Sequence, residues 1–248
     1  MFAIISDLHS NIEALGAVFA DMASQGVTER VCLGDVVGYG PNPRECLDMV
    51  KDCTFILRGN HEDGLLNIAE DFNPRARAAL EWTRSQLSSP EHSKEANYAY
   101  WDQIDSFEST HERDDMLFVH GSPSDPIWEY VLPEWGDEPE IMAELFRSFP
   151  HRVAFGGHTH VPGLFTMGEG FVHAASLPEV VKLPARSFVN VGSVGQPRDG
   201  DRRACYVIVD GDSIRFRRVA YDVAKTAGKI LQIPQLDRFL ATRLSAGV

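Results

Sequence analysis

The sequence predicts an α/β protein with mixed β-sheets, and three observations lead to this expectation. Short apolar runs rich in β-branched residues recur along the chain, as is typical of buried strands. Amphipathic segments alternate with the first of these runs, a pattern found in layered α/β proteins. Two late runs, 204–209 and 214–219, are separated by Gly211 and Asp212, which favours a hairpin and therefore antiparallel pairing.

The predicted strands are short and spread over most of the chain. They cover Phe2–Ile5, Val31–Leu33, Thr54–Leu57, Met116–Val119, Arg152–Phe155, Phe188–Val191, Cys205–Val209 and Ile214–Val219.

Three helices are predicted between these strands. Ser10 and Glu13 have the spacing of a capping box, with Ser10 as N-cap and Glu13 at the third helical position. Apolar residues at helical spacing follow, and Gly26 marks the end of this helix. The other two helices are expected at Arg44–Val50 and Pro74–Leu87.

We expect one domain over residues 1–248. The stretch 121–150 is rich in Pro, Trp and acidic residues and is predicted to be an inserted loop region, with a short helix near Glu140–Ser148. The segment 222–248 is expected to be a peripheral helical tail.

Composition narrows the function classes. The chain has 248 residues, enough to bury a core without disulfides, and its formal net charge of −13 argues against a broad nucleic-acid-binding surface. No run is apolar enough to cross a bilayer, and the start of the chain lacks the pattern of a signal peptide. The four cysteines show no metal-binding or disulfide spacing. We therefore expect a cytoplasmic protein with reduced thiols and no membrane partner.

Ligand-type polar residues follow the predicted strands. The carboxyl ends of strands in α/β sheets gather where ligands bind, so these residues are expected to meet in one place. They are Asp7, His9, Asp35, Asn60, His61, His120, His158 and His160.

Spacing and neighbouring glycines support this site. Asp7 and His9 are two residues apart, so an extended backbone would place both on one face, and the same holds for His158 and His160. Glycines beside several of these residues allow tight turns. Each motif alone is weak, since a lone D-x-H, G-D or H-x-H is common at surfaces and turns. Their joint occurrence, in order and after strands, indicates a metal site.

The ordered set D-x-H, G-D, G-N-H-E, H-G and G-H-T-H resembles the calcineurin-like metallophosphoesterase superfamily. The segments 6–11, 34–41 and 190–198 resemble its small prokaryotic phosphodiesterase-like branch. The resemblance covers about residues 1–220 and implies a four-layer α/β/β/α sandwich with two mixed β-sheets.

The resemblance also implies roles for these residues. One metal would be held by Asp7, His9, Asp35 and His160, and a second by Asp35, Asn60, His120 and His158, with Asp35 bridging. His61 would bind no metal but would contact the substrate phosphate or protonate the leaving oxygen. Oxygen and imidazole ligands without thiolate suit Mn, Fe, Zn or similar ions, and they argue against a closed, Cys-rich structural zinc site. We expect two divalent metal ions, with Mn preferred and Fe, Zn, Ni or Co as alternatives.

The expected reaction is metal-dependent hydrolysis of phosphoesters, by a phosphodiesterase or phosphatase acting on small substrates, with nucleotides among the candidates. Two ions about 3.5–4 Å apart would lower the pKa of a bridging water, which attacks phosphorus in line. Asn11 and Arg198 are candidates for substrate binding, although a helix-start role for Asn11 and a hairpin-loop role for Arg198 remain open. Trp128, Tyr130 and Trp135 either stack a base or form the core of their own loop.

Two other functions stay open. A serine/threonine phosphoprotein phosphatase of this superfamily carries G-D-x-x-D-R-G, whereas this chain has Val37-Gly38-Tyr39-Gly40 after Asp35 and so lacks the second Asp and the Arg. A non-catalytic metal-binding scaffold protein is the other alternative, although every ligand position is filled. The substrate, the native metals and a homo-oligomeric state are not fixed by the sequence.

Overall fold

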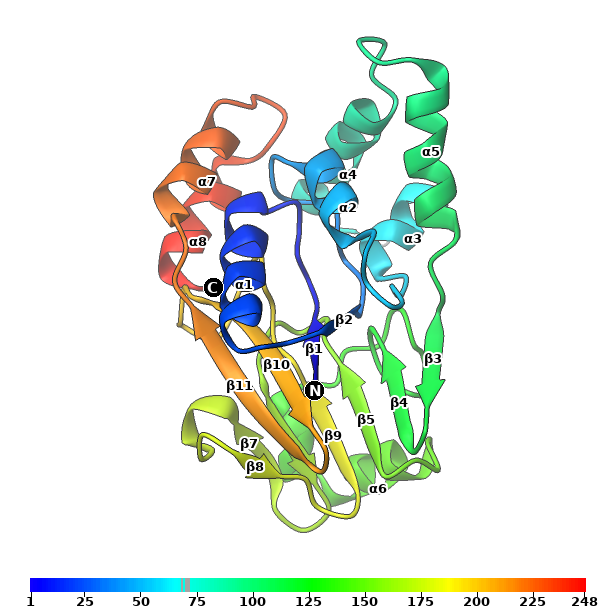
Figure 1. Cartoon of the computed structure of the whole chain (residues 1–248), viewed down its shortest axis with the longest axis vertical. Coiled ribbons are helices and arrows are strands. Elements are labelled where there is room, and N and C mark those ends of the chain that lie inside the picture. Colours follow the sequence, from blue (N-terminus) through cyan, green and yellow to red (C-terminus); the bar gives the residue numbers. More distant parts are fainter. Residues whose placement is uncertain (68, 70–71) are drawn as a thin grey trace.

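Two mixed β-sheets form the centre of the computed structural model, which describes residues 1–67, 69 and 72–248 (Figure 1). The first sheet has the strand order β2 (Glu29–Cys32), β1 (Phe2–Ile5), β10 (Ala204–Asp210), β11 (Ser213–Val219) and β8 (Val181–Lys182). The second has the order β3 (Thr110–Arg113), β4 (Met116–Val119), β5 (Val153–Gly156), β9 (Ser187–Asn190), β6 (Gly163–Thr166) and β7 (Gly170–His173).

Both sheets combine parallel and antiparallel pairs, as the sequence predicts. β1 is parallel to β2 and antiparallel to β10, while β5 is parallel to both β4 and β9. The predicted hairpin is present, because β10 and β11 pair antiparallel from Ala204 with Val219 to Asp210 with Ser213.

The helices lie outside the sheets. They are α1 (Ile12–Ser24), α2 (Pro43–Val50), α3 (Asn60–Leu66), α4 (Pro74–Leu87), α5 (Lys94–Asp105), α6 (Pro139–Arg147), α7 (Val223–Leu231) and α8 (Arg238–Ala246), with short 3₁₀ helices η1 (Pro133–Asp137) and η2 (Ala174–Ser176). Within the described residues, none is long and apolar enough to cross a membrane.

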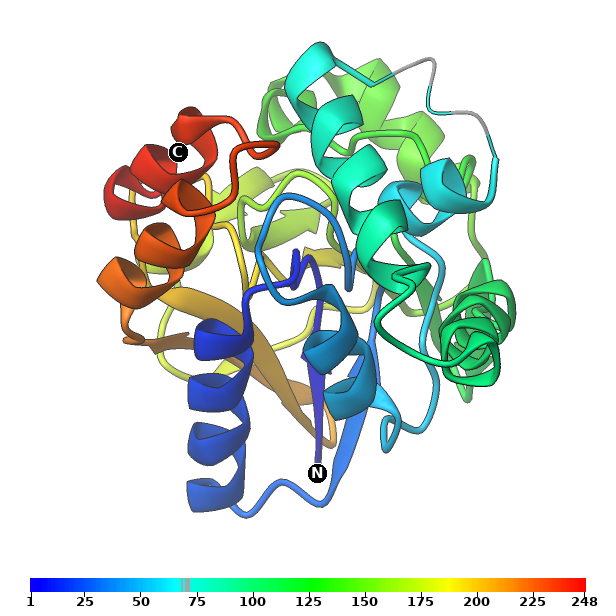
Figure 2. The ribbon, with the colours of Figure 1, turned by 90° about the horizontal axis from the view of Figure 1, so that it is seen from above.

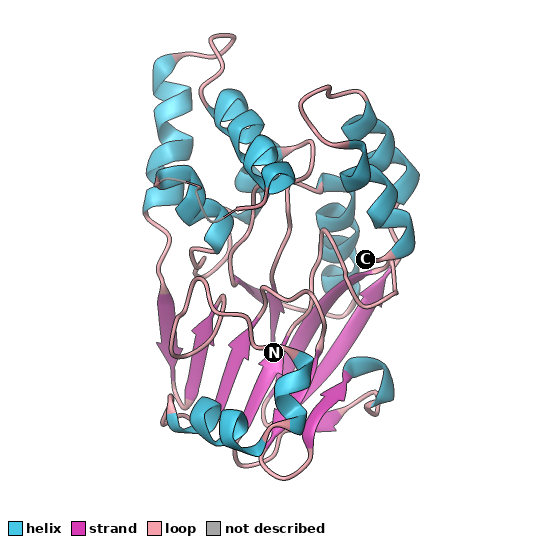
Figure 3. Cartoon of the chain, turned by 180° about the vertical axis from the view of Figure 1, so that it is seen from behind, coloured by secondary structure: helices cyan, strands magenta, loops and turns pink. Residues whose placement is uncertain are grey.

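Alternation along the strands separates three apolar cores and thereby produces four layers. Successive strand residues point to opposite faces, so Ile4 of β1 faces the second sheet and packs in one cluster with Val189 of β9. Ile5 points the other way and packs with helix α1. On the far face of the second sheet, Phe188 packs with Phe146 of α6 (Figure 3). The α/β/β/α sandwich is confirmed.

One predicted strand is wrong. Thr54–Leu57 runs beside β2, where the Leu57 amide donates to the Cys32 carbonyl at 2.8 Å. It forms only single bridges, from Ile56 to Cys32 and from Leu57 to Glu108. The segment pairs with a different partner on each side at single residues, so no continuous ladder develops.

The predicted cap of the first helix is displaced by one residue. Asn11, not Ser10, is the N-cap, since its side-chain oxygen accepts from the Ala14 amide at 3.1 Å. Ser10 has a φ of +54°, outside the range of a capping residue. Glu13 does not return to the cap but accepts from Lys229 at 2.7 Å.

The C-terminal segment, predicted to be helical, forms the two helices α7 and α8. Ile230 of α7 and Leu240 and Leu244 of α8 are buried in one cluster with Ala79 and Trp82 of α4. In the view from above, the loops that follow the strands lie in the middle, between α7 and α8 on one side and α4 on the other (Figure 2). α8 therefore borders the end of the molecule where the strand ends meet.

Candidate metal centre

The candidate ligands come together at the carboxyl ends of strands from both sheets. All are buried, and each lies in the loop after its strand, except that Asn60 is the first residue of α3. They are Asp7 and His9 after β1, Asp35 after β2, His120 after β4, and His158 and His160 after β5.

The backbone of these loops is left-handed, which corrects the expectation of extended D-x-H and H-x-H segments. The φ angles are +55° at Asp7, +45° at His9, +66° at His158 and +63° at His160. Residues other than glycine rarely adopt this region and do so at a cost of about 1–2 kcal/mol each. Backbone hydrogen bonds hold the first loop in place, for example from the His9 amide to the Asp35 carbonyl at 2.9 Å.

A first cluster contains Asp7, His9, Asp35 and His160, whose ligand atoms all lie within 4.8 Å of one another. The Nε2 atoms of His9 and His160 are 3.1 Å apart. Oδ1 of Asp7 lies 3.1 Å from Nε2 of His160, and Oδ2 of Asp35 lies 3.7 Å from Nε2 of His9.

A second cluster contains Asp35, His120 and His158, with Asn60 beside it. Nε2 of His120 lies 3.1 Å from Nδ1 of His158 and 3.4 Å from Oδ1 of Asn60. Oδ2 of Asp35 is 3.5 Å from His120 Nε2, so one carboxylate oxygen faces both clusters. The two sets are those that the sequence resemblance implies.

The four imidazoles present lone pairs to one another. In each ring one nitrogen contacts a backbone carbonyl, to which it must donate, and the other nitrogen is then an acceptor. These carbonyl contacts are His9 Nδ1 with Val37 at 3.2 Å, His120 Nδ1 with Leu33 at 3.0 Å, His158 Nε2 with Trp128 at 3.1 Å and His160 Nδ1 with Gln196 at 2.5 Å. Facing acceptors at about 3 Å repel unless a cation lies between them.

Electrostatics keep His160 and Asp7 in the state that binds metals but disfavour a charged Asp35. Burial, together with the Arg198 charge, lowers the pKa of His160 to about 4, so its ring is neutral at pH 7. Burial opposes ionisation of Asp7, but the neighbouring histidines, His160 first, outweigh it and hold the pKa of Asp7 well below its usual range. Burial and the nearby carboxylates raise the pKa of Asp35. A shared cation would relieve this unfavourable charge.

The residues present fit a pair of divalent cations. Oδ1 of Asp7 is buried and has no hydrogen-bond partner among the described residues, as expected for a ligand atom. The donors are carboxylate, amide and imidazole groups without thiolate, a set that suits Mn, Fe or Zn. The clusters are consistent with a site for two metals.

Two glycines allow the loops to approach this closely. A Cβ on Gly59 would collide with Oδ1 of Asp35, and a Cβ on Gly157 would collide with the side chains of Ser6 and Asp7. Only a residue without a side chain therefore fits at either position.

Glu62 is a buried part of the site that the sequence analysis did not single out. Its carboxylate accepts from the amides of Asp35 at 2.8 Å, Gly59 at 3.0 Å and Val37 at 3.1 Å. Burial raises its pKa to about 7. Its place directly after G-N-H, in the first turn of α3, is the signal that points to it.

His61 lies beside the clusters and belongs to neither of them. Its amide donates to Oδ1 of Asp35 at 2.9 Å, and its ring centroid is 4.7 Å from that of His9 and 4.5 Å from that of Tyr39. Burial, together with the Arg198 charge, lowers the pKa of His61. Nδ1 of its ring is buried without a hydrogen-bond partner in the described part of the chain.

The two candidates for substrate binding differ in their surroundings. The Arg198 guanidinium donates to Gln196 at 3.1 Å and lies near enough to affect the pKa of His9, His61 and His160. The structure therefore brings it to the metal centre.

Asn11 has its polar atoms engaged within the protein. Its oxygen accepts from Ala14 and from the Thr226 hydroxyl, and its nitrogen donates to the Gly195 carbonyl at 2.8 Å. These contacts tie α1 to α7 and to the loop after β9.

Aromatic residues of the 121–150 region differ in position. The ring of Tyr130 stacks on His158, with centroids 3.7 Å apart, and Trp128 packs against Phe72 at 5.5 Å. Trp135 instead packs against the core beneath the second sheet. Part of this region therefore covers the second cluster.

Fold and site together define a metallophosphoesterase-type α/β protein with buried His/Asp clusters. The model of the calcineurin-like phosphoesterase superfamily domain matches residues 1–213, and the chain belongs to this family.

Two proteins resemble the whole chain closely. The uncharacterized protein MJ0912 of Methanocaldococcus jannaschii is 35% identical over 100% of this chain and 98% of its own length. The crystal structure of a metallophosphoesterase from Sphaerobacter thermophilus is 36% identical, with a TM-score of 0.83 over 100% of this chain and 99% of that one. The hypothetical protein PH1004 of Pyrococcus horikoshii, 17% identical, shares the fold with a TM-score of 0.77 over 100% and 98%.

Proposed function

We propose that this protein hydrolyses phosphoesters of small molecules with two divalent cations, held by the two clusters that share Asp35. The observation that supports this most strongly is the set of buried imidazole lone pairs facing one another around a single carboxylate oxygen. When bound, such a pair of ions would acidify a water and neutralise charge on the phosphate. Mn is the metal that we expect.

The chain's own residues have distinct tasks in this proposal. The carbonyl of Val37 and its counterparts at the other rings fix which imidazole nitrogen points inward. Glu62 accepts from the amides of Asp35 and Val37 and so orients the loop that carries the shared carboxylate. His61 contacts the substrate phosphate or delivers a proton to the leaving oxygen. Arg198 supplies a positive charge beside it.

A phosphoprotein phosphatase is less well supported. The loop after Asp35 carries Val37-Gly38-Tyr39-Gly40, and Tyr39 packs on His9 and His61 where that class has a polar motif. A non-catalytic scaffold would not require a buried ring such as His61 beside the clusters and outside both of them.

The test is a metal analysis followed by a matrix of metals and substrates. Purified protein is stripped with a chelator, reloaded with Mn, Fe, Zn, Ni or Co, and assayed on bis(p-nitrophenyl) phosphate, p-nitrophenyl phosphate and a phosphoserine peptide. We expect chelator-sensitive turnover of the diester that Mn restores. Preference for the phosphopeptide would favour the phosphatase, and absence of turnover with every metal and substrate would contradict the proposal.

A further inference from the structure

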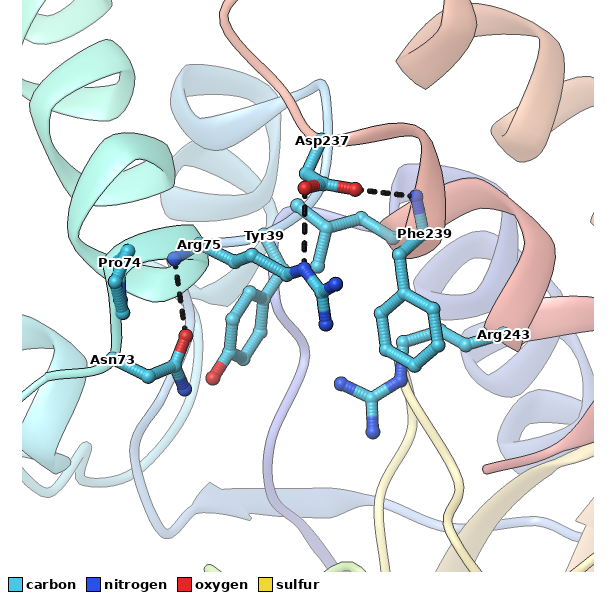
Figure 4. Close-up of a pocket in the computed structure, with 8 residues that line it drawn as sticks. Tyr39, Asn73, Pro74, Arg75, Asp237, Phe239 and Arg243 are labelled. Atoms are coloured by element: carbon cyan, nitrogen blue, oxygen red, sulfur yellow. Dashed lines mark hydrogen bonds and ion pairs between the residues drawn. The ribbon is translucent and has the colours of Figure 1, made fainter.

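A cavity of about 490 Å³ lies next to the metal centre, and its walls carry positive charge (Figure 4). The side chain of Tyr39 is a wall shared by the cavity and the metal centre. Its ring centroid lies 4.7 Å from that of His9 and 4.5 Å from that of His61, and Tyr39 also lines the cavity. A substrate phosphate at the metal centre would therefore have the rest of its molecule within reach of this cavity.

Two arginines from different helices point into the cavity. Arg75 comes from the start of α4 and Arg243 from α8, and both guanidinium groups lie over the Phe239 ring, at 4.7 and 5.3 Å from its centroid. Asp237 accepts from Nε of Arg75 at 3.1 Å, which leaves the outer nitrogens of that guanidinium in the space between the Tyr39 and Phe239 rings (Figure 4).

The positive charges around the cavity exceed the negative ones. Asp237 is the acidic residue among those that line it, against Arg75 and Arg243. Arg198 adds a third guanidinium near Tyr39: burial raises the pKa of the Tyr39 hydroxyl, and the charge of Arg198 opposes this rise. Burial and then the charge of Arg198 lower the pKa of Arg243 to about 10, a sign that these cations repel one another. An anion placed between them would remove this repulsion.

From this arrangement we infer that the cavity is a subsite for a second phosphate of the substrate, distinct from the phosphate that is cleaved. The inference rests on the proposed phosphoesterase function and narrows its substrates to phosphoesters that carry a further phosphate group. Guanidinium forks match phosphate oxygens in geometry and charge. A base stacked on Phe239 would have to displace two arginines from that ring, so a phosphate is the better occupant.

The part of the chain that forms this wall adds to the argument. Asp237, Phe239 and Arg243 lie beyond residue 213, where the match to the superfamily model ends. Of the two arginines that line the cavity, Arg75 thus lies inside the matched residues and Arg243 beyond them.

A matched pair of chromogenic substrates tests the subsite. Thymidine 5′-(p-nitrophenyl phosphate) is compared with the same compound bearing a 3′-phosphate, using the Mn-loaded protein and release of nitrophenolate. Wild type is expected to show a kcat/KM at least tenfold higher for the 3′-phosphorylated compound. Arg243→Gln and Arg75→Gln are each expected to reduce this ratio by about tenfold, the effect of one lost charge-assisted contact.

Three controls make the outcome specific. Arg147→Gln removes the same charge from an exposed position on α6, on the far face of the second sheet, and should leave the ratio as in wild type. Arg243→Lys should keep part of the preference. Melting curves of all variants show whether the fold is retained. Equal turnover of both compounds by wild type, or equal losses on both in the variants, would overturn the subsite.

Direct binding separates this inference from the proposed function. Calorimetric titration of metal-free protein with pyrophosphate requires no turnover. We expect pyrophosphate to bind, and Arg75→Gln and Arg243→Gln each to weaken this binding at least fivefold. If the protein showed such binding but hydrolysed no ester, the hydrolase proposal would be refuted and the anion subsite supported. Turnover of diesters without any such binding or preference would refute the subsite and leave the hydrolase in place.

Discussion

Nε2 of His9 and Nε2 of His160 face each other at 3.1 Å, although the other nitrogen of each ring is committed to a backbone carbonyl. Two facing acceptors in a buried space destabilise the metal-free fold, and a cation between them reverses this. The stability of the protein should therefore depend on metal.

Addition of Mn to chelator-treated protein should raise its Tm by about 5–10 °C. A ligand at 100 times its Kd adds about 2.7 kcal/mol, and each kcal/mol shifts the Tm of a chain of this size by about 2–4 °C. Differential scanning calorimetry measures the shift. His160→Ala should abolish most of it, whereas His92→Ala, at an exposed position, should not change it. A Tm indifferent to Mn in wild type would argue against the clusters as metal sites.

His61 allows chemistry to be separated from metal binding, because it belongs to neither cluster. His61→Asn should lower kcat on bis(p-nitrophenyl) phosphate by about 10²–10⁴-fold, the range for loss of a positioned proton donor. Metal content should stay as in wild type. Unchanged turnover at full metal content would remove His61 from the mechanism.

Gly59 tests the close packing behind the shared carboxylate. In Gly59→Ala the added Cβ would collide with Oδ1 of Asp35 and displace it, and a misplacement of about 1 Å can cost about 10²-fold in rate. Gly16→Ala is the matched control, since a Cβ there meets nothing within 4 Å. That change should add about 0.5–1 kcal/mol of stability by favouring the helix. If both variants kept full activity, the packing behind Asp35 would not matter.

Asp21 predicts a pH dependence of stability far from the metal centre. It accepts from Arg217 at 2.8 Å and from the Tyr206 hydroxyl at 2.7 Å, which joins α1 to the β10–β11 hairpin. Burial alone would raise the pKa of Asp21, but these partners outweigh it and lower the pKa below the usual 3.8.

A depressed carboxyl pKa stabilises the fold above the unfolded-state pKa, and this contribution disappears as the pH falls through the folded-state pKa. Asp21→Asn should cost about 1–3 kcal/mol at pH 7, measured by urea unfolding. The difference in the free energy of unfolding between wild type and variant should narrow below about pH 4, near the unfolded-state pKa of an aspartate. A gap that widened with acid would show that another group is responsible.

The four layers and the clustering of the candidate ligands could be predicted from the sequence because both depend on local sequence patterns. Asp7, Asp35 and His120 each follow an apolar run, and the ends of such runs meet at one edge in α/β sheets. The strand at Thr54–Leu57 has the same composition as the others but lacks partners to form a ladder, which no local signal reports.

Features that depend on tertiary contacts were not accessible in this way. The left-handed backbone at Asp7 and His158 is stabilised by hydrogen bonds between distant loops, such as the one from the Asp7 amide to Gly34. Glu62 accepts from the amide of Asp35, a contact between residues 27 positions apart that no local pattern reports. The charge of the cavity comes from Arg75 and Arg243, which lie far apart in the sequence.

The most direct test of the shared carboxylate is a crystal of the protein soaked in Mn and measured near the Mn absorption edge. The anomalous difference map should show two peaks about 3.5–4 Å apart, one beside His9 and His160, the other beside His120 and His158, with Asp35 between them. A single peak, or a pair that does not flank Asp35, would contradict the two-cation centre.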